Sequence, residues 1–448
     1  MERVLNFENL KNIHFIGVGG VSMSALAEYS LKLGFKVSGS DIFASERTSR
    51  LLSLGCDISF IHQAKNVRGA DAVVYSVAVS SDNPELRYSL KKQIPTFTRG
   101  EFLGKIINCY KNSVAVSGCH GKTTTTAMIA NVLTFSGKDP TVFLGGDDYE
   151  FKNLRVGQSQ FVIAEACEYK KSFLNFNPKV SVVLNIGNDH LDTYGDMNEL
   201  LSAFKQFSSS SISVINADDE NAKKIIGACS VTFGIDNTAN YYATRLASNN
   251  GFYSFTLNAH SKPLGRIKLG VQGKHNVYNA LASFAVCDIL GVSVQKFIKA
   301  IQSFKGVKRR NEFMGNLNGL NYYADYAHHP QELFAMLNTY RENLDKFITV
   351  FQPHTYSRTK LLMNDFVNVL KDVSPLIIYS TYPAREEFDI DGDAKSLYEN
   401  IRSQNSSNIF YAQTLEKLND IINEIKDNKN VVVLGAGDIY DIVNSLFV

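Results

Sequence analysis

The chain of 448 residues is too long for a single hydrophobic core, so two or three domains are expected. Hydrophobic residues make up 44% of it and charged residues 20%, a composition that excludes a disordered or fibrous protein. The formal net charge of +2 gives no overall attraction to nucleic acid or to an anionic membrane, so a bound anion needs a local site.

Neither the start of the chain nor its cysteines indicate export. The opening MERVLNFENLKN lacks the apolar stretch of a signal peptide, and no apolar run reaches the ~18 residues that a membrane-spanning helix needs. The six cysteines form no C-x-x-C pair and show no disulfide-like spacing. We therefore expect a cytoplasmic protein without membrane or nucleic-acid partners. The sequence does not decide between a monomer and a homodimer.

Short apolar segments alternate with amphipathic ones along the whole chain, which predicts βαβ units and an α/β fold with parallel sheets. The pattern begins three times, so we place domain boundaries near Cys109 and Arg309, giving domains 1–109, 110–309 and 310–448. Helices are expected at 21–34 and from 122. The expected strands are 12–17, 35–41, 71–79, 113–118, 161–166, 180–187, 318–325, 346–353, 374–380 and 430–434.

The first loop with a chemical signal is FIGVGGVSMSALA, which places Gly17, Gly19 and Gly20 between a strand and a helix. Glycines there let the backbone approach a diphosphate, and the helix start supplies N–H groups. Ser22 stands where G-x-G-x-x-G has its third glycine. Asp41 ends the next strand, where a dinucleotide fold has a ribose-binding acid. The loop fits a nicotinamide dinucleotide or a UDP-sugar, and a plain tight turn would also explain its glycines.

The second loop is AVSGCHGKTTTTAMIANVL at 115–133, which resembles a phosphate loop although Val116 replaces its first glycine. Backbone N–H groups can still surround a phosphate, a lysine can reach the β- and γ-oxygens, and a threonine hydroxyl can ligate Mg²⁺. A strand, a glycine loop and Lys-Thr at a helix start together predict an ATP site. The candidate ATP-binding residues here are Gly118, Cys119, His120, Gly121, Lys122, Thr123 and Thr124.

Acidic residues at the ends of the next strands suit metal ions. Glu165 ends the strand at 161–166, where it can approach Mg²⁺ held by Thr123, and His190 follows the strand at 180–187 within NDHLD. The predicted metal ligands are therefore Thr123, Glu165 and His190, although His190 could instead be an ordinary surface histidine. A zinc site of Cys119, His120, Cys167 and His190 is disfavoured, because that loop must turn its backbone towards phosphate.

Taken in order, the motifs cover residues 12 to 440. Because of these motifs, the chain resembles the Mur ligases. The matching stretches are GVGGVSMSALA, SGCHGKTTTTAM, EACEY, NIGNDHLDTYG, GKHNVYNALAS, GVKRRNEF, ADYAHHPQEL, FQPHTYSRT, YPAREE and GAGDI. The resemblance implies an α/β protein of three domains: N-terminal Rossmann-like, central P-loop ATPase-like with a mostly parallel sheet, and C-terminal Rossmann-like. It is greatest to the members that join L-alanine to UDP-N-acetylmuramate for peptidoglycan synthesis, through an acyl phosphate made with ATP and Mg²⁺.

The resemblance also implies roles for single residues. Lys122, Glu165, His190 and Arg385 would be catalytic, and Arg385, His354 and Arg358 are the candidates for holding the carboxylate of the amino acid. The UDP-sugar would lie on Gly17, Gly19, Gly20 and Ser22. Further ATP contacts would come from His275, Asn276, Asn279, Arg310, Asp325 and His329, with helix capping as the alternative role of Asn276.

The chain departs from the family pattern at three places. Ala324 replaces the first of two aspartates, so only Asp325 can take over that role, and Cys167 replaces an acid in the E-A-D-E form of the metal motif. Lys205 matches no motif of the carbamylated lysine found elsewhere in the superfamily, and no general base for the amine is identified.

Three alternatives remain open at this point. A recycling ligase that attaches a ready-made peptide to the same UDP-sugar would share most motifs. An NAD-dependent oxidoreductase would use the first loop and Asp41 but leaves the phosphate loop unexplained. A regulatory protein without ligase chemistry could keep every motif.

Overall fold

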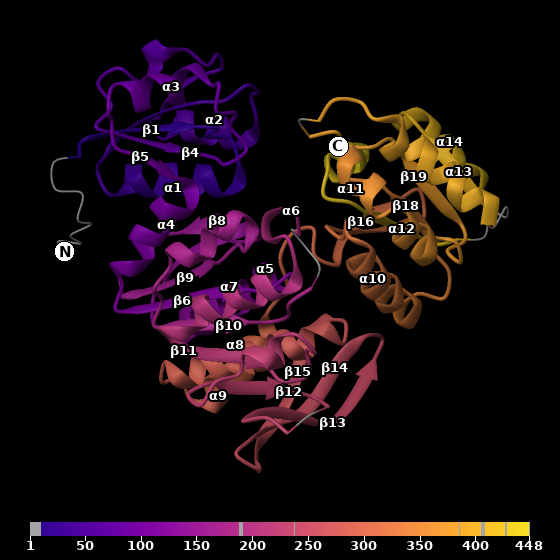
Figure 1. Ribbon diagram of the computed structural model, residues 1–448. Helices are drawn as coiled ribbons and strands as arrows, with labels where there is room; N and C mark the ends of the chain where they lie inside the picture. The colour runs from indigo at the N-terminus through magenta and orange to yellow at the C-terminus, as the bar shows by residue number, and fades with distance from the viewer. Residues whose placement is uncertain are drawn as a thin grey trace. The chain divides into compact units, whose positions relative to one another are not determined.

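The structure is a computed structural model that describes residues 10–187, 191–236, 238–384, 386–404, 408–425 and 428–447 (Figure 1). It forms two compact units. The first unit holds residues up to 247, 254–270 and 276–305. The second unit holds residues 248–253, 271–275 and 306 onward. Three sheets, mostly parallel, carry the helices, which confirms the predicted α/β class. The domain boundaries near residues 109 and 309 stay predictions.

The first sheet of the first unit has five parallel strands in the order β3-β2-β1-β4-β5. The chain leaves β1 in one direction and returns to β4 on its other side, so a crevice opens at the carboxyl ends of these two strands. The strands are β1 Asn12–Ile16, β2 Lys36–Ser40, β3 Asp57–Ser59, β4 Ala72–Tyr75 and β5 Thr96–Thr98. The helices are α1 Val21–Lys32, α2 Glu46–Ser53, α3 Pro84–Lys91 and α4 Arg99–Asn108, with the 3-10 turn η1 Ala64–Val67.

The second sheet has ten strands in the order β15-β14-β13-β12-β11-β10-β6-β9-β7-β8, and β8 is antiparallel to β7. Its strands are β6 Asn112–Ser117, β7 Thr141–Asp148, β8 Lys152–Arg155, β9 Phe161–Glu165, β10 Val180–Val183, β11 Ile212–Asn216, β12 Val231–Gly234, β13 Tyr241–Asn249, β14 Phe252–Ala259 and β15 Lys262–Gln272. Its helices are α5 Lys122–Phe135, α6 Leu191–Tyr194, α7 Met197–Ser209, α8 His275–Ile289 and α9 Val294–Ser303, with η2 Tyr169–Asn175 and η3 Ala222–Ile225.

Helix α1 joins the first two sheets through a common apolar core. The ring of Tyr29 meets that of Phe143 on β7 edge-on at 5.2 Å, and its hydroxyl lies 2.9 Å from the hydroxyl of Tyr110. Asn153 on β8 donates to the carbonyl of Val21 at 2.6 Å. These contacts bring the start of α1 beside the middle of β7 and the carboxyl end of β9, which is where the site described below lies.

The second unit holds a six-stranded sheet in the order β16-β17-β21-β18-β19-β20, parallel except for the β16–β17 pair. Its strands are β16 Glu312–Leu317, β17 Leu320–Asp325, β18 Ile348–Phe351, β19 Leu376–Tyr379, β20 Ile409–Ala412 and β21 Asn430–Leu434. Its helices are α10 Pro330–Asn343, α11 Tyr356–Leu361, α12 Met363–Leu370, α13 Ala394–Gln404, α14 Leu415–Glu424 and α15 Ile439–Asn444, with the short turns η4 Ile390–Gly392 and η5 Ser445–Phe447. Within the described part of the chain, no helix is long and apolar enough to cross a membrane.

A buried carboxylate ties together the loops at the carboxyl edge of the first sheet. Glu85, in the first turn of α3, is 0% exposed. One oxygen accepts from Ser40 at 2.5 Å and lies 3.4 Å from His14 and 3.3 Å from His62, and the other accepts from Asn66 at 2.5 Å. Burial opposes the charged form, but the hydrogen bonds from His14 and Ser40 outweigh it and lower the pKa of Glu85 to about 2.

We expect Glu85→Gln to lower the free energy of unfolding by about 2 kcal/mol at pH 7, because the charged acceptor of several buried donors is lost. The folded-state pKa lies below the ordinary value of 4.5, so the stabilisation is present above that pH and is lost as the pH falls towards 2. Urea unfolding followed by circular dichroism at pH 7 and at acid pH measures this. The exposed Glu150→Gln serves as the control, and a Glu85→Gln deficit that is the same at both pH values would contradict the assignment.

Candidate active site

The phosphate loop turns sharply between β6 and α5 and is held from the neighbouring strand. Gly118 and Gly121 have φ of +137° and +84°, values in the region that favours glycine. Asn185, just beyond β10, accepts the N–H of His120 at 2.9 Å, donates to its carbonyl at 3.1 Å, and offers its own carbonyl to the N–H of Cys119 at 3.3 Å. The sequence analysis did not single out Asn185, although it follows a strand next to the loop.

Lys122, the first residue of α5, bends back over this loop. Its ammonium donates to the carbonyl of Gly118, to that of Cys119 at 3.1 Å, and to both carboxylate oxygens of Glu168 at 3.3 Å. Burial works against the charge, but Glu168, itself 1% exposed, raises the pKa of Lys122 above its ordinary value. Lys122 is thus a protonated group aimed along the loop. No role was predicted for Glu168, although it is the second glutamate of the EACEY stretch.

Thr123 and Glu165 come together as the sequence predicts. The hydroxyl of Thr123, which is 4% exposed, donates to Glu165 Oε2 at 3.1 Å, and Glu165 Oε1 accepts the N–H of Gly145 at 2.5 Å. A hydroxyl and a carboxylate are hard oxygen donors that fit Mg²⁺, which usually keeps several waters. No cluster of three or more His, Cys, Asp or Glu that could hold a metal occurs in the described ranges. His190 lies outside the described residues.

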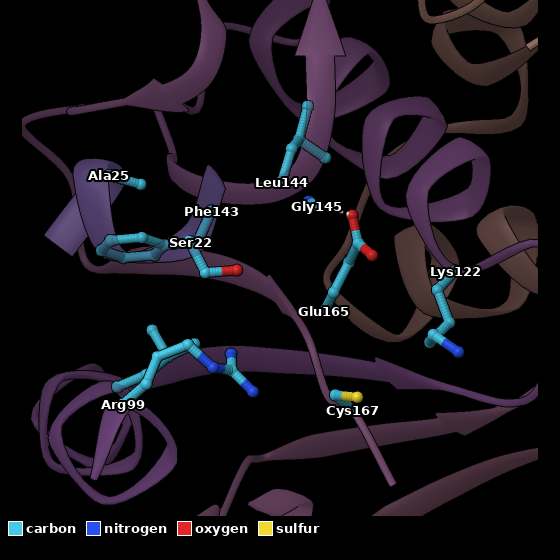
Figure 2. Close-up of a pocket in the computed structure, with 10 residues that line it drawn as sticks. Ser22, Ala25, Arg99, Lys122, Phe143, Leu144, Gly145, Glu165 and Cys167 are labelled. Carbon is cyan, nitrogen blue, oxygen red and sulfur yellow. Dashed lines mark hydrogen bonds between the residues drawn. The ribbon is translucent and has the colours of Figure 1, made fainter. Parts of the chain in front are cut away.

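Figure 2 shows the cavity that these residues line, about 180 Å³ in volume. Glu165 and Lys122 lie at one end, and Ser22 and Arg99 at the other. Cys167 and the middle of β7, at Leu144 and Gly145, lie on opposite sides of the cavity. The lining residues are Ser22, Ala25, Arg99, Leu103, Lys122, Phe143, Leu144, Gly145, Glu165 and Cys167.

The N-terminal glycine loop reaches this cavity through Ser22. Gly17 adopts φ of +78°, and Gly20 is the N-cap of α1 without a side-chain cap. Asp41 accepts the N–H of Gly19 at 2.7 Å through one oxygen, and its other oxygen accepts the N–H of the following residue at 2.8 Å. Asp41 therefore shapes the loop instead of offering a carboxylate to a ribose, which argues against the oxidoreductase reading.

Asn276 and Asn279, predicted to contact adenine, lie behind the phosphate-loop helix. Asn279 donates to Asn276 Oδ1 at 2.9 Å and accepts from the hydroxyl of Thr125 at 3.2 Å. Each asparagine is only 5% exposed. In this structure the pair braces α5 against α8, so their contact with ATP stays a prediction.

The candidates His275, Arg310 and Asp325 belong to the second unit. Asp325, at the end of β17, accepts the N–H groups of Asn311 at 2.7 Å and Ala327 at 2.8 Å. Burial raises its pKa to about 6, against the opposing charge of Arg310. Burial lowers the pKa of His275 to about 4, and the positive charge of Arg310 is the smaller cause. His329, the N-cap of α10, donates its N–H to Glu332 at 3.2 Å.

His354 and Arg358, two candidates for the amino-acid carboxylate, contact each other after β18. Arg358 Nη1 lies 3.1 Å from His354 Nδ1, and since arginine can only donate, Nδ1 accepts and Nε2 carries the proton. The ring of His354 stacks on Tyr382 with centroids 5.4 Å apart. Burial, with the charges of His328 and Arg358, lowers the pKa of His354 to about 3. The third candidate, Arg385, lies outside the described residues.

The two cysteines of the rejected zinc alternative have other surroundings. Cys119 Sγ accepts the N–H of Gly187 at 2.9 Å. Burial and then Glu168 raise the pKa of Cys167, with Lys122 and Arg99 opposing them. A thiol with a raised pKa is a poor zinc ligand. All six cysteines are described, and none of them forms a disulfide.

Three family models match consecutive parts of the chain. The "Mur ligase family, catalytic domain" matches residues 12–111, the "Mur ligase middle domain" residues 116–287, and the "Mur ligase, glutamate ligase domain" residues 309–437. Together they span all three sheets.

Relatives at about 40% identity are UDP-N-acetylmuramate–L-alanine ligases. The UDP-N-acetylmuramate–L-alanine ligase of Acetivibrio thermocellus is 42% identical, covering 98% of this chain and 96% of its own. That of Clostridium tetani is 40% identical, covering 96% of each chain. A crystal structure of the Thermotoga maritima UDP-N-acetylmuramate-alanine ligase matches with a TM-score of 0.84, 30% identity and 98% coverage of both chains.

A pair of glycine variants tests the loop geometry. Gly121 and Gly137 both have positive φ, +84° and +79°, but an added Cβ would lie 2.7 Å from Asn279 Oδ1 at Gly121 and meet nothing within 4 Å at Gly137. Both changes to alanine strain the backbone, at about 1 kcal/mol. Only Gly121→Ala should also displace the loop and weaken ATP binding by at least about tenfold. Calorimetry with MgATP measures the affinities; equal values for the two variants would refute the packing argument.

Proposed function

The chain belongs to the Mur ligase family, and on that premise we propose that it joins L-alanine to UDP-N-acetylmuramate with ATP. An oxygen of the muramate carboxylate attacks the γ-phosphorus, the bond to the β-phosphate oxygen breaks, and ADP leaves. The amine of alanine then attacks the acyl carbon, phosphate leaves, and the nitrogen loses a proton. The product is an amide.

The observation that carries this proposal is the shared cavity. Lys122 and Glu165, which belong to the phosphate-loop side, line it together with Ser22 from the glycine loop. A phosphoryl donor at one end and an acid-bearing sugar nucleotide at the other can therefore meet within one cavity. Holding the reacting groups together in this way replaces a collision in solution by a positioned reaction.

Each part of the phosphate-loop site has a proposed role. The backbone N–H groups between Gly118 and Gly121 and the Lys122 ammonium would surround the β- and γ-phosphates, where charge develops during transfer. Thr123 and Glu165 would hold Mg²⁺, with His190 as the ligand of a second ion. When bound, the metal neutralises negative charge on the phosphates and on the acceptor carboxylate.

The second unit holds the residues that we propose to contact the amino acid and ATP. His354 presents Nε2–H as a donor, and Arg358 and Arg385 supply guanidinium groups that match a carboxylate. His275, Arg310 and Asp325 are the proposed ATP contacts there. A closed site protects an acyl phosphate from water.

We also propose that the protein works in the cytoplasm, where ATP and UDP-sugars are available. None of the six cysteines forms a disulfide, which fits a reducing compartment. The step would belong to peptidoglycan precursor synthesis.

Phosphate release separates this proposal from its alternatives. With ATP, Mg²⁺ and UDP-N-acetylmuramate, we expect release to depend on L-alanine, whereas a recycling ligase would respond to a tripeptide instead. Malachite green detection in each combination measures this. Phosphate release that does not depend on the sugar nucleotide would contradict every ligase version. Glycine and serine are tested in place of alanine as competing amino acids.

Removing the Lys122 ammonium should lower kcat by on the order of 100-fold or more, because one positioned cation contributes several kcal/mol to phosphoryl transfer. The change Lys122→Ala also leaves Glu168 without that partner, so circular dichroism must accompany the kinetics. The exposed Lys111→Ala is the matched control. Near-wild-type turnover in a folded Lys122→Ala protein would exclude the proposed role.

Arg385→Ala should raise KM for alanine far more than KM for ATP, since its guanidinium is proposed to hold the amino-acid carboxylate. Steady-state kinetics with each substrate varied in turn gives the comparison, and Arg358→Ala run in parallel ranks the two arginines. If both KM values rise equally, the residue acts in closing the site instead.

A further inference from the structure

Arg99 is a cation of the cavity that no motif of the sequence analysis singled out. It is the first residue of α4, after the N-cap Thr98, whose hydroxyl accepts the N–H of Glu101 at 3.2 Å while the Glu101 carboxylate accepts the N–H of Thr98 at 2.7 Å. This reciprocal cap fixes where the helix begins. Figure 2 shows the half-buried side chain extending from α4 into the space between Ser22 and Cys167.

The charge of Arg99 is not balanced by the acids nearby. Glu165 is engaged by Thr123 and by the N–H of Gly145, and Glu168 pairs with Lys122. Across the described ranges, no hydrogen bond or ion pair reaches the Arg99 guanidinium. Arg99 and Cys167 both line the cavity.

An arginine fork without a carboxylate partner, at the wall of a partly open cavity, is suited to an anionic oxygen group of a ligand. Arginine is always protonated and presents parallel N–H donors, so it matches a phosphate or a carboxylate in two-point contact. The opposite end of the cavity already has its own cation, Lys122. A substrate that spans this cavity therefore meets a positive group at each end.

On the basis of the proposed function, we infer that Arg99 binds an acidic group of the sugar nucleotide, at the end of the cavity formed with Ser22. UDP-N-acetylmuramate has two such groups, the diphosphate and the lactyl carboxylate. The position beside Ser22, in the first turn of α1, favours the diphosphate, because the glycine loop leads to the same point. Arg99 then orients the substrate so that its carboxylate faces Lys122.

Direct binding without ATP tests this inference. Calorimetry would compare UDP, UDP-N-acetylglucosamine and UDP-N-acetylmuramate on the wild type, Arg99→Ala, Arg99→Lys and the control Lys105→Ala. Lys105 is an exposed residue of the same helix, over the ring of Phe97 at 5.2 Å. We expect Arg99→Ala to weaken UDP-N-acetylmuramate binding by about tenfold or more, Arg99→Lys to retain part of the affinity, and Lys105→Ala to leave it unchanged.

The three ligands distinguish the two acidic groups. An equal loss for all three assigns Arg99 to the diphosphate, and a loss confined to UDP-N-acetylmuramate assigns it to the lactyl carboxylate. Wild-type affinity of Arg99→Ala for UDP-N-acetylmuramate would overturn the inference. A wild-type protein that binds none of the three would instead count against the proposed function. Circular dichroism verifies folding, and Arg99→Gln replaces Arg99→Ala if the latter unfolds.

Discussion

The pairing of the half-buried Lys122 ammonium is the interaction on which the phosphate-loop site depends. A positive charge in such a place needs compensation, and two loop carbonyls and the Glu168 carboxylate supply it. The same contacts keep the loop from collapsing, because they hold the lysine against the turn that the two glycines make. Asn185 then fixes the turn from the adjacent strand.

Much of this arrangement was predictable from local patterns. Apolar runs bounded by glycine and polar residues marked the strands, and the α/β class and the meeting of Thr123 with Glu165 at 3.1 Å followed from them. Parallel strands end at one edge of their sheet, so residues after such strands gather there. The predicted metal role of this pair remains a prediction, as do the roles of His190 and Arg385.

The residues that were missed act through contacts distant in sequence. Glu168 meets Lys122 across 46 positions, and Asn185 meets His120 across 65. Arg99 comes from the helix after the first sheet, and nothing in its local pattern indicates that α4 faces the central sheet. Asn279 illustrates the converse: a motif drew attention to it, yet its side chain packs inside, against Thr125. Neither the contacts that are distant in sequence nor the inward packing of Asn279 can be predicted from composition or periodicity.

The apolar core beneath α1 has a consequence for substrate choice. The contact between Tyr29 and Phe143 and the Asn153–Val21 hydrogen bond hold α1, at the glycine-loop end of the cavity, against strands β7 and β8 of the central sheet. Separating the two ends would expose that core to water, a change that costs free energy in proportion to the apolar area uncovered. If the two ends bind the diphosphate and the phosphoryl donor as proposed, the distance between them limits the substrates that can react. A sugar nucleotide whose acid lies too near to its diphosphate, or too far from it, would not bring that acid to the phosphoryl group.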